Sequence, residues 1–583
     1  MSAPQRWVLA EAHPEQSAVL AAEARLPAVL AELLVARGVT TAGEAFAFLN
    51  PEVSQLHDPF RMRGMQAAVE RVETAIARRE PVLLYGDYDV DGTTAVVLLK
   101  TAIEMLGGVA RFHVPHRLRE GYGLQSRVLE SAYAEGVRLI ITVDTGMRAF
   151  AEAETARRLG LDLILTDHHL AQAGDELPCA LAVLNPNQHG CGYPEKSLCG
   201  AAIALKLAQA LLERRDRERT RDKTLPSFLK MAAIATIADA VPLRGENRVI
   251  AALGLRELRR PVGPGLRALF AVAALDPAAK QLTGYDVAFR LAPRINAAGR
   301  MDVASEVVEL FSTRDPARAR HLAVKLERLN RERRETEELA LKAIEERLAN
   351  DAELAGDCLL VVDGEGWHRG VIGILASRVV ERCAKPAIVV SVEDGVAYGS
   401  GRSVDGFPML EAIESCAGLF TRFGGHAFAV GFALPADSLP ELKRRLREHA
   451  NARLAGRAAE RVLKIHAELP VDRITPVLAG WLKKLEPLGH GNPEPIFVAK
   501  RVKVMSAPRI MRERHVRLEL AQMENAAGSG SMRAVGWNLA SRAAEFGLRE
   551  GSVIDVAYKI RENEHPDYGG IEIEIVGIDA LSA

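Results

Sequence analysis

Three aspartates stand at alternate positions directly after an apolar run, in the segment VLLYGDYDVDGTT at residues 82–94. They are Asp87, Asp89 and Asp91. Carboxylates this close repel one another, and a buried strand end does not hold them together unless a cation neutralises them. The flanking Gly86 and Gly92 indicate a junction of strand, loop and helix, where ligands gather in α/β sheets. The segment therefore predicts a metal site, with an acidic surface turn as the alternative.

Other predicted strands also end in acids. The apolar runs LIITVD and DLILTD end in Asp144 and Asp167, and the second is followed by His168 and His169. Because the carboxyl ends of parallel strands meet at one edge of a sheet, we expect these side chains to converge. Asp239 lies in the small-residue stretch MAAIATIADAVPL, where a buried carboxylate needs a partner. It is interpreted as a metal ligand or as a helix-terminal cap.

Hard oxygen ligands with an imidazole, and no CxxC pair, suit Mg²⁺ or Mn²⁺ better than a structural zinc. The predicted ligands of two such ions are Asp87, Asp89, Asp91, Asp144, His168 and Asp239. Two ions sharing a bridging carboxylate stabilise both the attacking and the leaving oxygen in a displacement at phosphorus, and they need no protein nucleophile. The residues predicted to carry catalysis are Asp89, Asp91, Asp144, His168 and His169. Asp167 or His169 would fix an imidazole tautomer or contact the substrate.

The glycines and threonines around this segment also resemble a degenerate P-loop. The segment lacks the lysine that follows the second glycine of a P-loop, and its acids would repel phosphate in the absence of metal. A P-loop NTPase is therefore disfavoured.

The elements that position these residues follow from hydrophobic periodicity. Short apolar runs alternate with amphipathic helices from residue 82 to 167, which predicts an α/β fold with a mostly parallel sheet. A glycine-poor, charged stretch predicts one long helix, and a second α/β pattern follows it. Short alternating strands near the C-terminus then predict an OB-like β-barrel, with an antiparallel sandwich as the alternative. The predicted domains are an N-terminal helical region (1–80), a catalytic domain (81–310), a connector helix (311–355), a smaller α/β lobe (356–455) and an OB-like nucleic-acid-binding domain (456–583).

The composition is that of an ordinary soluble protein, with 48% apolar and 26% charged residues among 583. With 75 Lys and Arg against 76 Asp and Glu, a polyanion would have to be held by a local basic surface. Six cysteines without a CxxC pair, no export signal and no membrane-length apolar run predict a cytoplasmic protein with no membrane partner.

Several motifs together resemble the DHH phosphoesterase superfamily. They are DYDVDG at 87–92, RLREGYGL at 117–124, TVDTG at 142–146, TDHH at 166–169 and IADAVPL around Asp239. Five more resemble the bacterial single-strand-specific exonucleases of that superfamily: PRINAAGRM at 293–301, GWHRGVIGILASR at 366–378, GSGRS at 399–403, FGGHAFAVGF at 423–432 and LGHGNPEPIF at 488–497. The resemblance runs from about residue 45 to the end, and His490 and the charged insertion at 214–223 are its peripheral departures.

The resemblance implies a role for each matching position. Asp89 and Asp91 match metal-binding acids, while Asp87 stands where other branches use a different first ligand. Asp144 is similar to the bridging carboxylate, His168 to the imidazole ligand and Asp239 to the last carboxylate. The residues implied to bind substrate are Arg117, Arg294, Asn296, Arg300, Ser400, Arg402 and His426. Of these, Arg117 and Ser400 with Arg402 resemble the pocket for a terminal 5′-phosphate, with His426 nearby. Replication-fork relatives lose the metal acids, which are all present here, so catalysis is expected.

These inferences predict a metal-dependent exonuclease that degrades single-stranded DNA in the 5′ to 3′ direction by two-metal-ion hydrolysis and releases mononucleotides in DNA repair and recombination. Its cofactors would be two divalent cations, Mn²⁺ or Mg²⁺, and its partners single-stranded DNA, preferably 5′-phosphorylated, a helicase and a single-strand binding protein. The chain would act as a monomer, with the second lobe closing over the cleft.

The barrel would grip the strand through basic residues, namely Arg501, Lys503, Arg509, Arg512, Arg514 and Arg517. Trp537 or Tyr558 would stack on bases, or would belong to the core. Two other functions stay open at this point: a DHH enzyme acting on short oligonucleotides or cyclic dinucleotides, and a non-catalytic single-strand binding or scaffold protein.

Overall fold

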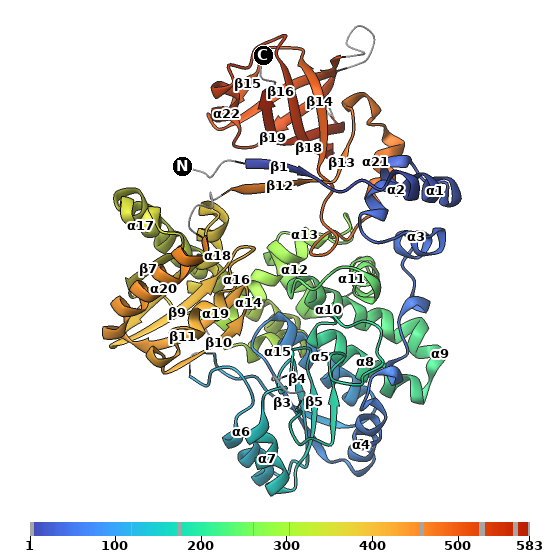
Figure 1. Ribbon diagram of the computed structural model, residues 1–583. Coiled ribbons are helices and arrows are strands. Elements are labelled where there is room, and N and C mark those ends of the chain that lie inside the picture. The colour runs from blue at the N-terminus through green and yellow to red at the C-terminus, as the bar shows by residue number, and fades with distance from the viewer. Residues whose placement is uncertain are drawn as a thin grey trace. The chain divides into compact units, whose positions relative to one another are not determined.

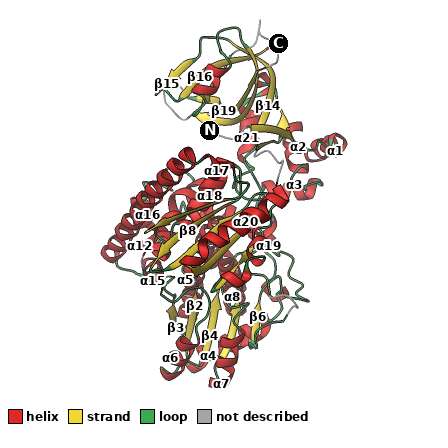
Figure 2. Cartoon of the chain, turned by 60° about the vertical axis from the view of Figure 1, so that its left-hand side comes forward, coloured by secondary structure: helices red, strands yellow, loops and turns green. Residues whose placement is uncertain are grey.

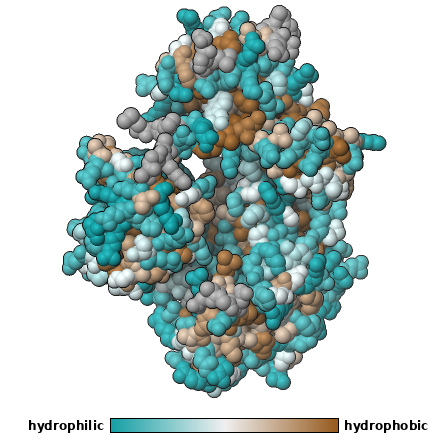
Figure 3. Space-filling model, viewed as in Figure 1, coloured by the Kyte–Doolittle hydropathy of each residue, from teal (hydrophilic) through white to brown (hydrophobic). Residues whose placement is uncertain are grey.

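The computed structural model describes residues 5–117, 119–171, 176–260, 262–301, 303–454, 460–523, 531–563 and 569–580 (Figure 1). The chain divides into two compact units. The small unit comprises Met1–Trp7, Arg294–Val303 and His321–Leu463, and the large unit comprises Val8–Pro293, Ala304–Arg320 and Lys464–Ala583. Across the part of the chain that the structure describes, no helix combines the length and the apolar character needed to cross a bilayer. Figure 3 shows hydrophilic side chains over most of the visible face, in keeping with the charged composition.

The large unit contains a five-stranded parallel sheet, as the sequence predicts. Its strands, in spatial order, are β3 (Val109–His113), β2 (Pro81–Gly86), β4 (Leu139–Val143), β5 (Asp162–Thr166) and β6 (Ala182–Leu184). The central strands are buried on both faces, which explains their nearly continuous apolar sequences. The short strand β6 was not predicted.

Helices cover both faces of this sheet. The helices that pack beside it are α4 (Met65–Arg78), α5 (Val90–Met105), α6 (Ser126–Ala134), α7 (Phe150–Leu159) and α8 (Gly200–Arg215). Leu83, Ile140 and Leu165 form a core with α6 and α7. Helix α5 begins at Val90, because the Asp89 side chain caps its N-terminus.

Further helices follow the sheet along the chain. They are α9 (Arg217–Arg219), α10 (Leu225–Ala238), α11 (Gly245–Glu257), α12 (Pro264–Val272), α13 (Gly284–Asp286), α14 (Ala292–Met301) and α15 (Ser305–Ser312). The long predicted connector is the 35-residue helix α16 (Pro316–Asn350).

The small unit has its own five-stranded sheet, with helices α18 (Ile372–Cys383), α19 (Met409–Glu414) and α20 (Leu439–Leu454) packed against it. Its strands, in spatial order, are β10 (Arg422–His426), β11 (Ala429–Pro435), β9 (Val396–Arg402), β8 (Ala387–Glu393) and β7 (Leu360–Glu365). Within this sheet only β7 and β8 pair in parallel. Strand β9 is antiparallel to both β8 and β11, and the glycine-rich stretch FGGHAFAVGFAL forms the antiparallel hairpin β10–β11.

The C-terminal sheet of the large unit is a partial ring and is not clearly closed (Figure 2). Its strands, in order, are β13 (Ala467–Glu468), β14 (Phe497–Val504), β18 (Val553–Asn563), β19 (Gly570–Ala580), β17 (Met532–Gly536), β16 (His515–Gln522) and β15 (Arg509–Met511). An additional pairing of β14 with β16 curves the sheet. The arrangement confirms the predicted OB-like domain.

The core of this domain includes N-terminal helices. Leu20, Leu30 and Leu34 pack in the same apolar cluster as Val502 and Leu518. The helices concerned are α1 (Pro14–Ala24), α2 (Ala28–Val35) and α3 (Ala42–Leu49). Residues from the two ends of the large unit are therefore held together by burial of apolar surface.

A single arginine joins the N-terminal helices, helix α11 and the segment that leads into the OB-like domain. Arg248 is 2% exposed, and its guanidinium donates to the carbonyl oxygens of Phe48, Lys484, Leu485 and Glu486 at 2.8–2.9 Å.

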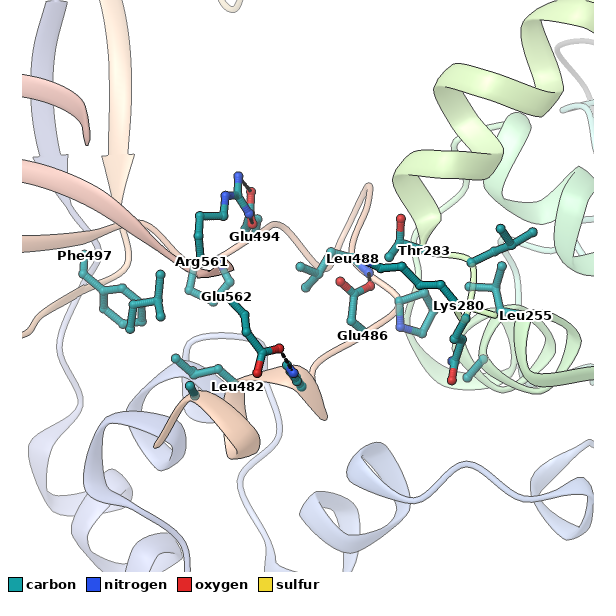
Figure 4. Close-up of a pocket in the computed structure, with 18 residues that line it drawn as sticks. Leu255, Lys280, Thr283, Leu482, Glu486, Leu488, Glu494, Phe497, Arg561 and Glu562 are labelled. Atoms are coloured by element: carbon teal, nitrogen blue, oxygen red, sulfur yellow. Dashed lines mark hydrogen bonds and ion pairs between the residues drawn. The ribbon is translucent and has the colours of Figure 1, made fainter. Parts of the chain in front are cut away.

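The segment that leads into the OB-like domain also lines a pocket of about 520 Å³, in which Glu486 and Leu488 face Leu255 (Figure 4). Two basic side chains that line the pocket form ion pairs, Arg561 with Glu494 and Lys483 with Glu562.

Candidate metal centre

A tight turn brings the first three aspartates together. Asp87 directly follows β2, and Asp89 caps helix α5 by accepting a hydrogen bond from the amide N of Gly92 at 3.0 Å. A Cβ at position 92 would lie 2.6 Å from the backbone N of Asp87, so the turn requires glycine there. Two residues beyond Asp89, Asp91 is buried in the first turn of the helix.

Asp144 holds a rare backbone conformation at the end of β4. Its φ is 60°, and its amide N donates to the carbonyl oxygen of Thr166 at 2.9 Å, which continues the ladder to β5. Its side chain is 3% exposed, and Oδ1 lies 3.2 Å from Nε2 of His168 without forming a hydrogen bond. A left-handed backbone is uncommon for residues other than glycine, and residues that adopt it cluster at active sites and ligand-binding sites.

Asp167 organises the histidine pair. Its Oδ1 accepts hydrogen bonds from the backbone N of His168 at 2.8 Å and from Nδ1 of His169 at 2.7 Å, and its Oδ2 accepts from the backbone N of Met147 at 2.9 Å. Burial alone would raise the pKa of Asp167, but the hydrogen bond from His169 and the backbone amides lower it below its ordinary value. Asp167 therefore fixes the ring of His169, one of the two options left open by the sequence.

His168 faces carboxylates on both edges of its ring. Its Nε2 lies 3.9 Å from Oδ2 of Asp91, and its Nδ1 lies 3.9 Å from Oδ2 of Asp239, which ends helix α10. Burial lowers the pKa of His168, which favours the neutral imidazole that binds metals.

Three overlapping groups of side chains have ligand atoms close enough together to hold an ion. They are Asp87 with Asp89 and Asp144; Asp91 with His168 and Asp239; and Asp144 with His168 and His169. Asp144 and His168 each belong to two of the groups, and of these two only Asp144 has a carboxylate, whose two oxygens could bridge two ions. The structure thus brings all six predicted metal ligands together at the carboxyl edge of the parallel sheet.

The electrostatics of this cluster require positive charge. Burial, followed by repulsion from neighbouring aspartates, raises the pKa of Asp87 and Asp144 well above the ordinary range. The same two causes raise the pKa of Asp89, and that of Asp239 to about 9. Oδ1 of Asp87 and Oδ1 of Asp144 are buried and have no hydrogen-bond partner. Buried, unsatisfied carboxylate oxygens beside a neutral imidazole fit Mn²⁺ or Mg²⁺.

The substrate residues predicted in the large and small units have different surroundings. In the large unit, the guanidinium of Arg117 lies over the ring of Tyr88, 5.1 Å from its centroid. In the small unit, Arg402 donates to Oγ of Ser400 at 3.1 Å. Gly373, in the first turn of α18, is so close that a Cβ there would lie 3.2 Å from both of these side chains. A hydroxyl, a guanidinium and a helix N-terminus together suit an anion.

Three other predicted substrate residues lie on helix α14 of the small unit. Arg294 forms an ion pair with Glu327 at 2.5 Å, and Arg300 donates to the carbonyl oxygen of Gly370 at 3.1 Å. Asn296 is partly buried on the same helix. His426 ends β10, and Ala429 of β11 pairs with both His426 and Arg402, so His426 lies two strands from Arg402.

Sequence reasoning missed two features of this centre. The amide N atoms of Gly200 and Ala201, at the start of α8, donate to Asp91 at 2.6 and 2.7 Å. The only signal was a glycine opening a small-residue helix, far along the chain from Asp91. Tyr122 was also missed; its hydroxyl lies 3.4 Å from Nδ1 of His169.

Acids and histidines lie at the carboxyl edge of a parallel sheet, and a second α/β lobe follows in the chain, which is the arrangement expected of a DHH phosphoesterase. Family models agree: "DHH family, N-terminal domain" matches residues 81–236, "DHHA1 domain" matches 356–452 and "RecJ OB domain" matches 465–576. The chain belongs to the RecJ family.

Relatives of known name support this assignment over nearly the whole length. The chain is 35% identical to "Single-stranded-DNA-specific exonuclease RecJ" of Dickeya dadantii, covering 92% of this chain and 94% of the relative. It is also 35% identical to the protein of the same name from Bacillus subtilis, covering 97% of this chain and 69% of the relative. A crystal structure of RecJ from Thermus thermophilus in complex with Mn²⁺ superposes with a TM-score of 0.83 at 28% identity, covering 99% of this chain and 80% of that one.

Proposed function

We propose that this protein is a metal-dependent exonuclease that degrades single-stranded DNA in the 5′ to 3′ direction and releases mononucleotides, in DNA repair and recombination. The observation that carries the proposal is the buried cluster of five aspartates and His168, with two carboxylate oxygens left without partners, in a chain of the RecJ family. Such a cluster serves no evident purpose in a scaffold protein, because its mutual repulsion only destabilises the fold.

Two divalent cations bound here would activate a water molecule and stabilise the oxygens that attack and leave phosphorus. The chain's own residues would hold the cations and the substrate in place. Asp87, Asp89, Asp91, Asp144, His168 and Asp239 are the proposed ligands. The hydrogen bond to Asp167 keeps a proton on Nδ1 of His169 and leaves Nε2 of that ring to contact the substrate.

The OB-like domain is proposed to grip the strand. On its surface Arg509 of β15 stands directly opposite Arg517 of β16, a like-charged pair that destabilises a sheet unless an anion lies over it. Trp537 is 53% exposed and is available for stacking on a base. Tyr558 is not available for stacking, because it is fully buried and its hydroxyl donates to the carbonyl oxygen of Leu469 at 2.6 Å. It belongs to the core of the domain.

The direction of digestion is proposed from the small unit. Ser400, Arg402 and the N-terminus of α18 offer a hydroxyl, a guanidinium and backbone amides to a terminal 5′-phosphate. Arg117, Arg294, Asn296, Arg300 and His426 are proposed to contact the same strand. A pocket that requires a terminal phosphate favours digestion from that end.

The domain limits 1–80, 81–310, 311–355, 356–455 and 456–583 remain our proposal. We further propose that the protein acts as a monomer in the cytoplasm. A helicase and a single-strand binding protein would supply the single strand.

The proposal is tested by incubating the purified protein and Mn²⁺ with three labelled substrates: a long single strand, the same sequence as a blunt duplex, and a dinucleotide. Rapid release of mononucleotides from the single strand alone, abolished by EDTA, is expected. Preference for the dinucleotide would indicate an oligonucleotide phosphodiesterase. Binding of the single strand without release of nucleotides would indicate a non-catalytic protein.

A further inference from the structure

The N-terminus of helix α8 lies directly against one of the proposed metal ligands. The backbone N atoms of Gly200 and Ala201 donate to the two carboxylate oxygens of Asp91, at 2.6 and 2.7 Å. Asp91 is 1% exposed, so these hydrogen bonds form away from water. Each oxygen keeps a second lone pair, so the two amides orient the carboxylate and still leave it able to bind a cation.

Gly200 also makes room for a second ligand. A Cβ at position 200 would lie 2.6 Å from Cβ of Asp144, 2.8 Å from its Oδ1 and 2.9 Å from its Cα. Real side chains do not approach this closely. Asp144 cannot move aside easily, because its backbone is in the left-handed region and its amide is hydrogen-bonded to Thr166. Only glycine therefore lets α8 approach this far.

The helix end also supplies partial positive charge. About half an elementary charge is present at a helix N-terminus, and here it faces carboxylates that repel one another. The helix does not complete the site, because Oδ1 of Asp144 remains buried without a hydrogen-bond partner. The amides thus hold Asp91 in position, and the helix leaves Oδ1 of Asp144 for a cation.

We propose that Gly200 is a positioning residue: the N-terminus of α8 sets the places of Asp91 and Asp144, and the lack of a side chain at Gly200 is what permits divalent-cation binding. This inference rests on the proposed metal-dependent function, and it assigns Gly200 no contact with metal or substrate. It deepens that function by making the site depend on a helix whose first residue is 109 positions from Asp91.

The test compares Gly200→Ala with Gly192→Ala in the full chain. Gly192 is a matched control, because a Cβ there would meet nothing within 4 Å. Mn²⁺ affinity is measured by titration calorimetry on metal-stripped protein, folding by circular dichroism, and single-strand binding by fluorescence anisotropy in EDTA. We expect Gly200→Ala to fold and to bind Mn²⁺ at least about tenfold more weakly than Gly192→Ala, since displaced ligands cost at least as much as lost supporting contacts. Single-strand binding in EDTA should be the same in both variants.

Ala201→Pro provides an independent variant. It removes the donor to Oδ1 of Asp91 and places the proline Cδ where the amide hydrogen pointed, so it displaces the carboxylate of Asp91 directly. Proline is tolerated in the first turn of a helix. Weaker Mn²⁺ binding is expected here as well, and this variant decides the question if Gly200→Ala does not fold. Wild-type Mn²⁺ affinity in the folded variants would overturn the inference. Because calorimetry uses no nucleic acid, this outcome is distinguishable from failure of the proposed nuclease activity.

Discussion

Asp144 combines an unusual backbone with a central place in the metal centre. Asparagine adopts the left-handed conformation as readily as aspartate, so Asp144→Asn removes the charge and leaves the backbone of φ 60° unstrained. Alanine at this position would confound loss of a ligand with backbone strain.

We expect Asp144→Asn to lower the nuclease rate by more than about 100-fold. Removal of residues that only support metal ligands already costs about 10- to 100-fold, and loss of a ligand should cost more. In EDTA the same variant should melt at or above the temperature of the wild type, because one of the mutually repelling carboxylates is gone. Nuclease assays with Mn²⁺ and thermal melts in EDTA check both parts. Substantial activity in the variant would remove Asp144 from the metal centre.

His466 predicts a pH dependence of stability far from the metal centre. Burial, and then the charge of Arg37, lowers the pKa of His466 from 6.5 to about 4, and its neutral Nδ1 accepts a hydrogen bond from the backbone N of Ile496 at 3.0 Å. Since the pKa is lower in the folded state, the unfolded chain binds the proton first as the pH falls. The stabilisation is therefore complete above about pH 6.5 and is lost as the pH falls toward about 4.

Asparagine can accept the same hydrogen bond and cannot be protonated. His466→Asn should therefore lose less of its free energy of unfolding than the wild type between about pH 7 and about pH 5. Urea unfolding of both proteins at the two pH values measures the difference. Equal losses would show that His466 titrates normally.

At the scale of elements, the parallel sheet and its ligands were predictable because strand ends obey a simple rule. Asp87, Asp144 and His168 each follow a short apolar strand, and the carboxyl edge collects them whatever their separation in sequence. The contribution of α8 was not predictable, because a backbone amide has no sequence signature and Gly200 resembles any glycine that opens a helix. Tyr558 and Trp537 look equivalent in sequence, yet Tyr558 is buried within β18, whereas Trp537 follows the end of β17 in a turn and is exposed.

Arg248 of helix α11 is buried, and its guanidinium is hydrogen-bonded both to the N-terminal helices and to the segment that leads into the OB-like domain. Arg248→Lys keeps the charge but offers a single nitrogen to four carbonyl oxygens, so some of them lose their partner at about 1–3 kcal/mol each. We expect the free energy of unfolding to fall by roughly 2–4 kcal/mol. Arg256→Lys, on the exposed side of the same helix, should change it by less than about 0.5 kcal/mol. Urea titrations measure the free energy of unfolding of both variants. Equal losses would contradict the role of Arg248 in holding these parts of the chain together.

The pairing of β15 with β16 predicts a salt-dependent contribution to DNA binding. Arg517→Gln removes one of two facing guanidinium groups, so the sheet should be no less stable while single-strand binding weakens. If Arg517 contacts one phosphate, the slope of log affinity against log salt should become shallower by about 0.7. Anisotropy titrations at several salt concentrations measure this slope. An unchanged slope would place the strand elsewhere on the domain.

At the scale of the whole molecule, the proposed functions are divided between the two compact units. The metal ligands belong to the large unit, whereas Ser400 and Arg402 belong to the small unit. Recognition of a strand end and hydrolysis should therefore be separable by mutation. A variant of the phosphate pocket should leave Mn²⁺ affinity intact.

Arg402→Gln tests this separation. The wild type should digest 5′-phosphorylated single strands about 10- to 100-fold faster than strands with a 5′-hydroxyl, since charge-assisted hydrogen bonds are worth about 1.5–3 kcal/mol. Arg402→Gln should erase most of that preference by slowing only the phosphorylated substrate. Arg422→Gln, at an exposed position of β10 in the same sheet, should retain the preference. Rates are measured on strands labelled at the 3′ end, with Mn²⁺ affinity measured in parallel. If Arg402→Gln kept the preference, or if the wild type had none, the pocket and the direction of digestion derived from it would both be wrong.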